Sequence, residues 1–161
     1  MNTPETVTTV LAKLAELRIV AALCGGWAEE ALGIIPPRPH KDIDLVVEAN
    51  DFSAIDQALI DGALKNEIAA KRFAHKRAFV FSETMVEMYL VQNRANRLVT
   101  MFWGDTEYVW RDPLVAVTQL YGTSIRAVTQ ENLLRFRRSH KSHEPWRWSD
   151  PNSLLPHLQP Y

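Results

Sequence analysis

The spacing of apolar residues predicts helices towards both ends of the chain. Near the N-terminus, the apolar residues from Val7 to Leu17 recur every three or four positions, as they do on one face of a helix. Thr3 and Pro4 precede this segment, and proline is well suited to the first helical position. A second clear helix is expected in QENLLRFRRSH, with Thr129 as its N-cap.

Shorter apolar runs between these helices predict strands. IVAALC is a candidate buried strand that ends at Gly25, DIDLVVE is a second strand, and AFVFSETMVEMYLVQ has the form of a β-hairpin. The expected strands are residues 19–24, 42–48, 78–81 and 85–91, with a turn at 82–84 and more strands between 97 and 128.

Two short helices complete the prediction. WAEEALG is expected to form one that is closed by Gly33, and Asp51 is expected to cap another that runs to Ile60 and stops at Gly62. Residues 34–40 contain three prolines and predict a loop. This order of elements predicts an α+β (α/β-like) fold, a mixed β-sheet with helices packed on it.

Length, charge and cysteine content narrow the class of protein. The chain has 161 residues, which suits one domain over 1–161 with a short C-terminal helix, an irregular tail and one helical turn after Asp150. The net charge of −1 argues against a general nucleic-acid coat, and the single Cys24 excludes an internal disulfide. With no signal peptide and no membrane-length apolar run, a cytoplasmic monomer or homodimer without membrane contact is expected.

Two aspartates in the strand at 42–48 indicate a metal site. Residues two apart in a strand point to the same face, so Asp42 and Asp44 project together. Two carboxylates this close repel each other, so binding of a cation between them is favourable. Mg²⁺ binds one or two carboxylates and completes its coordination with water and phosphate oxygens. Glu87, the charged residue in MVEMYLV, is the candidate third carboxylate of a two-metal site. The alternative for Glu87 is a solvent-facing position on a half-exposed hairpin.

A strand that ends in glycines and continues into a helix indicates a phosphate site. Gly25 and Gly26 would let backbone N–H groups approach an anion at the helix start. Trp27 suits either packing or stacking on a substrate. Arg38 and His40 either hold a nucleotide phosphate or are solvated loop residues, and the same alternatives apply to Lys76 and Arg77.

The motif GGWAEEALG…RPHKDIDLVV resembles the signature of the antibiotic nucleotidyltransferases within the DNA polymerase beta-like superfamily. The lincosamide-modifying enzymes and the aminoglycoside 2″-nucleotidyltransferases carry a similar Gly-Gly-Trp, a short helix and an Arg-x-His-x-Asp-Ile-Asp-like run. The fifteen residues between Gly26 and Asp42 resemble the spacing in the lincosamide group. RAFVFSETMVEMYLV resembles the hairpin with the third acid, and IRAVTQENLLRFRRSH and SDPNSLL resemble the closing strand, helix and tail.

The resemblance implies a nucleotidyltransferase fold and a Mg²⁺-dependent transfer of a nucleotide from an NTP to a hydroxyl of a small molecule. Gly25, Gly26 and the helix start at Trp27 would hold the triphosphate, and Asp42 and Asp44 one or two Mg²⁺ ions. Glu87 would bind the second ion or remove the acceptor's proton. The chain departs from the family pattern at Glu87, where relatives usually have Asp, and at Glu30, also usually Asp.

The acceptor is the least constrained part of the prediction. The basic, aromatic C-terminal third favours a neutral or singly charged molecule such as a lincosamide over a polycationic aminoglycoside. Two alternatives have a different function: a nucleotidyltransferase-like toxin or RNA-modifying enzyme that uses the basic run RFRRSHKSH for RNA, and a catalytically silent nucleotide-binding protein. The five histidines show no zinc-ligand spacing.

Overall fold

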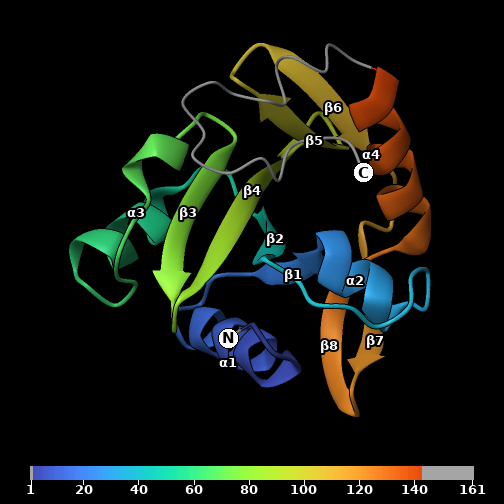
Figure 1. Cartoon of the computed structure of the whole chain (residues 1–161). Helices are drawn as coiled ribbons and strands as arrows, with labels where there is room; N and C mark the ends of the chain where they lie inside the picture. The colour runs from blue at the N-terminus through green and yellow to red at the C-terminus, as the bar shows by residue number, and fades with distance from the viewer. Residues whose placement is uncertain (1, 143–161) are drawn as a thin grey trace.

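The computed structural model describes residues 2–142, and the predicted turn after Asp150, the SDPNSLL tail and the end of the basic run lie outside these residues. A mixed sheet forms the centre of the molecule, with helices around it (Figure 1). The helices are α1 (Pro4–Glu16), α2 (Gly25–Ala31), α3 (Ser53–Ile60) and α4 (Gln130–Ser142), with a 3-10 turn η1 (Ala69–Lys71). The strands are β1 (Ala21–Cys24), β2 (Asp42–Glu48), β3 (Lys76–Phe81), β4 (Thr84–Arg94), β5 (Arg97–Phe102), β6 (Thr106–Trp110), β7 (Val115–Leu120) and β8 (Thr123–Val128).

The strand order places β1, β2 and β4 next to one another. The sheet runs β6-β5-β4-β2-β1-β8-β7, and β3 pairs with β4 outside this path. The β2–β4 and β1–β8 pairs are parallel and the other pairs are antiparallel, so the predicted mixed sheet is confirmed. α2 lies against β1 and β2 and contacts α4 and β7, while α3 lies beside β3 (Figure 1).

The alternation of polar and apolar residues in β2 decides which side chains enter the core. Ile43 and Leu45 are fully buried in the hydrophobic core, whereas Asp42 and Asp44 point to the other face. β4 follows the same rule, because Val86 and Met88 are fully buried in the same core. The acidic residues of both strands therefore share one face of the sheet.

The helix predictions at the two ends are confirmed. Thr3 is the N-cap of α1, its hydroxyl accepts a hydrogen bond from the Thr6 backbone N–H, and Val7, Val10 and Leu14 are buried. α4 begins directly after Thr129. Between residues 2 and 142 no helix has the length and apolar character of a membrane span.

Several boundaries differ from the prediction. The hairpin turn consists of Ser82 and Glu83 alone, both at positive φ, as a two-residue turn between twisted strands requires. β1 starts at Ala21 rather than Ile19. Phe52, not Asp51, is the N-cap of α3, although the Asp51 carboxylate still accepts a hydrogen bond from the Ser53 backbone N–H at 2.8 Å.

Candidate active site

Gly25, directly after the end of β1, lies beside Asp44 of the neighbouring strand β2. Cys24 is paired with Asp44 in the antiparallel ladder, so the chain turns into α2 directly beside the Asp44 side chain. Gly25 has φ +60, and a Cβ atom there would lie 2.2 Å from Asp44 Oδ2. Both the backbone conformation and the space therefore require glycine at position 25.

The next glycine accommodates a histidine from the proline-rich loop. A Cβ atom on Gly26 would lie 2.7 Å from His40 Nδ1 and 3.8 Å from an Arg38 guanidinium nitrogen. The His40 ring stacks at a tilt on Trp27, with 4.3 Å between ring centroids. The structure therefore brings together the five residues predicted for nucleotide binding, with Arg38 exposed and His40 almost buried.

Trp27 belongs to the core rather than to an open binding surface. Its side chain is 4% exposed, and its indole N–H donates a hydrogen bond to Asn2 Oδ1 at 3.1 Å. The Asn2 amide in turn donates to the backbone carbonyls of His40 and Asp42. Of the two predicted uses of Trp27, packing is the one that these contacts support.

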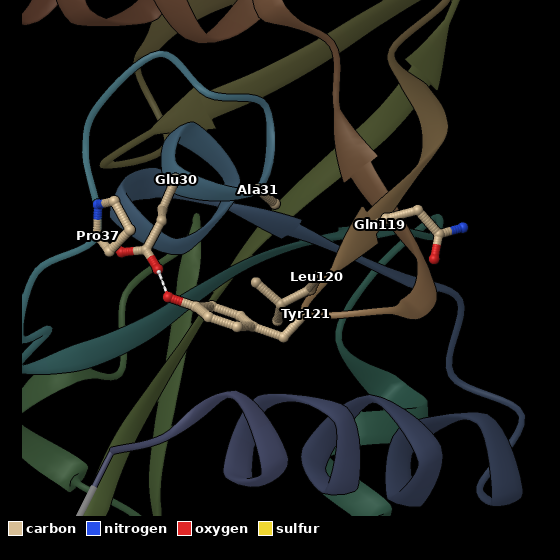
Figure 2. Close-up of a pocket in the computed structure, with 6 residues that line it drawn as sticks. All are labelled: Glu30, Ala31, Pro37, Gln119, Leu120 and Tyr121. Atoms are coloured by element: carbon tan, nitrogen blue, oxygen red, sulfur yellow. Dashed lines mark hydrogen bonds between the residues drawn. The ribbon is translucent and has the colours of Figure 1, made fainter.

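Glu30 connects the proline-rich loop to the β7–β8 hairpin. Its Oε2 atom lies 2.8 Å from His40 Nε2 and accepts a hydrogen bond from the Arg38 backbone N–H at 3.1 Å. Its Oε1 atom accepts a hydrogen bond from the Tyr121 hydroxyl at 2.7 Å, across a surface pocket that both residues line (Figure 2). Glu30 therefore holds the loop segment that presents Arg38 and His40.

The parallel pairing of β2 and β4 puts Glu87 beside the aspartates. Asp44 and Glu87 are directly paired in the ladder, so their side chains point to the same face. Glu87 is 0% exposed. The alternative of a solvent-facing Glu87 is therefore wrong.

Two lysines and a tyrosine surround the Glu87 carboxylate. Lys71 Nζ lies 2.7 Å from Oε1 and Lys76 Nζ lies 3.6 Å from the same oxygen. The Tyr89 hydroxyl donates a hydrogen bond to Oε2 at 3.2 Å. Both lysine side chains are fully buried, which is rare for lysine unless it is paired.

The electrostatics of the site favour the binding of a cation near the aspartates. Burial, followed by repulsion from Glu87, raises the pKa of Asp42 to about 6. Burial, followed by repulsion from Asp42 and Glu87, raises the pKa of Asp44 well above its ordinary value. Burial lowers the pKa of Lys76. A cation bound between the two aspartates would remove the penalty of their charged forms.

The donor set fits one hard divalent ion held by two carboxylates. The buried Asp42 Oδ2 atom has no hydrogen-bond partner, and an oxygen of this kind is a ligand that Mg²⁺ prefers. Within residues 2–142, no three His, Cys, Asp or Glu side chains are arranged to hold a metal. An ion at this place would therefore complete its coordination with water or with ligand oxygens.

Sequence reasoning did not identify the burial of the two lysines. Lys76 was predicted as a phosphate ligand or a solvated residue, and the turn η1 that carries Lys71 was not predicted. Arg77, which had the same alternatives as Lys76, instead pairs with Asp56 at 2.7 Å. The sequence carried a signal at Glu87, which is the charged residue in the otherwise apolar segment MVEMYLV, whereas Lys76 stands beside Arg77 at the start of β3.

Sequence analysis also did not identify an ion pair between α2 and α4. Glu29 is 3% exposed and pairs with Arg137 of α4. Arg137 belongs to the basic run RFRRSHKSH, and its pair with Glu29 connects α4 to the helix that starts at the candidate site.

The chain is a nucleotidyltransferase, as its match to the sequence profile of an enzyme family shows. The sequence profile of the aminoglycoside-2″-adenylyltransferase family matches residues 6–144. The chain belongs to this family of antibiotic nucleotidyltransferases, which confirms the resemblance and the enzyme class predicted from the sequence.

Solved structures share the fold of this chain. The lincosamide antibiotic adenylyltransferase LnuA, solved with lincomycin bound, superposes with a TM-score of 0.66 at 18% identity, over 93% of this chain and 91% of that one. The antibiotic-resistance factor ANT(2″)-Ia gives 0.63 at 12% identity, over 90% and 75% of the two chains. A putative nucleotidyltransferase from Thermotoga maritima gives 0.56 at 16% identity, over 93% and 96%. A comparison with curated protein sequences gave no significant match.

Proposed function

We propose that this protein transfers a nucleoside monophosphate from an NTP to a hydroxyl group of an antibiotic-like small molecule, with Mg²⁺ bound by Asp42 and Asp44. The observation that carries the proposal is the contact of Asp44 with Gly25, because it joins the acidic pair to the glycine turn in one site. The buried Asp42 Oδ2 atom without a hydrogen-bond partner supports the metal assignment. NTPs are abundant in the cytoplasm, where we expect the enzyme to act.

Each part of the site has a role in this reaction. In nucleotidyl transfer the acceptor oxygen bonds to the α-phosphorus while the bond to pyrophosphate breaks, and the acceptor hydroxyl gives its proton to solvent water. Bound Mg²⁺ supplies Lewis-acid stabilisation of the charge that develops on the phosphate oxygens. Gly25, Gly26, the Arg38 guanidinium and the His40 ring would hold the triphosphate. Glu87 adds the third negative charge on the same face.

We propose a lincosamide-like acceptor rather than a polycationic one. A cluster of amino groups on the acceptor would need acidic side chains around it. α4 instead carries Arg135 and Arg138, besides Arg137, which pairs with Glu29, and its acidic residue Glu131 lies in its first turn. Lincomycin is bound in the structure of LnuA, which has the same fold, so this compound is the first to test.

An assay with several acceptors tests this choice. The protein would be incubated with Mg²⁺, labelled ATP or GTP, and lincomycin, clindamycin, tobramycin or tRNA, and each product would be identified by mass spectrometry. The proposal expects a nucleotidylated lincosamide at a rate at least tenfold above that with tobramycin. Transfer to tRNA alone, with binding that weakens steeply as salt increases, would instead establish the RNA-modifying alternative.

A further inference from the structure

The fully buried lysines beside Glu87 distinguish this site from a simple arrangement of three carboxylates. Lys71 comes from η1 and Lys76 from β3, and both ammonium groups lie within 4 Å of Glu87 Oε1, at 2.7 and 3.6 Å. Ala78 is paired with Glu87 across the β3–β4 ladder. A small residue at this position leaves room for long side chains to reach the carboxylate.

We infer that the site binds a single divalent ion, at Asp42 and Asp44, and that the ammonium groups of Lys71 and Lys76, held by Glu87, supply the positive charge of a second ion. Two ammonium groups and one divalent ion carry the same total charge as two divalent ions. The inference rests on the proposed function and refines the role of Glu87 from metal ligand or general base to positioning residue.

The contacts of Glu87 are the first argument for this assignment. Oε1 is in contact with Lys71, and Oε2 accepts the hydrogen bond of Tyr89. A divalent ion on Glu87 would have to displace Lys71 and leave two buried ammonium groups next to a dication. Breaking a buried ion pair in this way is strongly destabilising, even before any repulsion from the metal is added.

The grouping of the acids is the second argument. Glu87 does not join Asp42 and Asp44 in a three-ligand cluster, because the described part of the chain contains no group of three acidic, His or Cys side chains arranged around a metal position. Asp42 Oδ2, in contrast, is buried without a hydrogen-bond partner. The two strands therefore have different roles. β2 provides the metal ligands, and β4 provides the carboxylate that pairs with the two lysines.

Counting bound Mn²⁺ tests this inference directly. Mn²⁺ replaces Mg²⁺ and is detected by electron paramagnetic resonance, with the full chain in excess over α,β-methylene-ATP, so that all nucleotide is protein-bound. We expect one bound Mn²⁺ per nucleotide complex, with an affinity at least tenfold weaker in the variant Asp44→Asn. Two bound Mn²⁺ ions in the unsubstituted protein would overturn the inference while leaving nucleotidyl transfer intact. No bound Mn²⁺ would instead refute the proposed function.

A charge-balanced variant separates ligand from counter-ion. Glu87→Gln alone leaves two buried ammonium groups without their carboxylate. Glu87→Gln combined with Lys71→Met removes one charge of each sign, so it leaves one ammonium group and does not change the net charge of the cluster. We expect this double variant to retain one Mn²⁺ per complex with an affinity within threefold of the original. A loss of Mn²⁺ affinity of tenfold or more would show that Glu87 is a metal ligand.

Discussion

The two aspartates of β2 reduce the stability of the metal-free protein at neutral pH, because burial and neighbouring negative charges disfavour their charged forms. Burial and neighbouring negative charges raise the pKa of Asp42 to about 6 from an ordinary value of 3.8. A carboxyl group whose pKa is higher in the folded state than in the unfolded state stabilises the fold below the unfolded pKa. This contribution is lost as the pH rises through the folded pKa. Metal-free protein should therefore lose stability between about pH 4 and pH 6.

Replacing Asp42 tests this account of the acidic pair. Asp42→Asn should raise the unfolding temperature of the metal-free protein at pH 8, because one of two repelling charges is removed. We expect the free energy of unfolding to rise by ~1–3 kcal/mol. Each kcal/mol raises the unfolding temperature by ~2–4 °C in a domain of this size. The same variant should lose Mg²⁺-dependent turnover.

Thermal unfolding in EDTA from pH 4 to pH 8, followed by circular dichroism, provides the measurement. Asp61→Asn, on the surface at the end of α3, is the control and should change neither the stability nor its pH dependence. If Asp42→Asn destabilised the protein at pH 8, the assignment of an unfavourable buried charge would be wrong.

At the scale of secondary structure, the glycine turn between β1 and α2 shapes the site. Gly25 and Gly33 both have positive φ, but a Cβ atom on Gly33 would have no atom within 4 Å, whereas one on Gly25 would collide with Asp44. Gly33→Ala is therefore a control for backbone strain alone, which amounts to ~1–2 kcal/mol. Gly25→Ala should destabilise the protein further and displace the Asp44 carboxylate.

Chemical unfolding and Mn²⁺ titration of the two variants separate these effects. We expect Gly25→Ala to weaken Mn²⁺ binding at least tenfold and Gly33→Ala to leave it unchanged. Equal Mn²⁺ affinities in the two folded variants would show that Gly25 does not help to place Asp44.

The loop that carries Arg38 and His40 depends on Glu30. Glu30→Ala removes the contacts with His40, the Arg38 backbone and Tyr121. We expect the KM for NTP to rise about tenfold with little change in kcat, because ordering of the loop would affect nucleotide binding rather than chemistry. Tyr121→Phe, which removes only the contact across the pocket, is the milder matched variant. A fall in kcat with an unchanged KM would contradict this role.

Local sequence patterns predicted the strands and helices whose bounds depend on residues close together in the sequence. The bounds of β2 and the same-face placement of Asp42 and Asp44 followed from the period of two in a strand, whereas the placement of Glu87 on that face also required β4 to pair with β2. The turn at Ser82 and Glu83 was placed one residue too long, because neither residue is among those that favour positive φ. The burial of Lys71 and Lys76 could not be predicted locally, because it requires a carboxylate from β4 that is distant in sequence.

On the scale of the whole molecule, the sheet and its connections assemble one site from three distant segments. β1 with α2 contributes the glycine turn, β2 the acidic pair, and η1, β3 and β4 the lysines with their counter-ion. The Glu29–Arg137 pair connects this centre to α4. The family profile spans nearly all of the same elements, so the enzyme class is a property of the whole fold and not only of a short motif.

The most direct test of the central claim is to follow the two ends of a labelled nucleotide. The protein, Mg²⁺ and lincomycin would be incubated with ATP labelled at the α-phosphate or, in parallel, at the γ-phosphate, with Asp44→Asn as the control. Nucleotidyl transfer predicts that the α-label appears in the antibiotic and the γ-label in pyrophosphate, with product at least a hundredfold lower in the variant. Label from the γ-phosphate in the antibiotic, or equal transfer by the Asp44→Asn variant, would contradict the account.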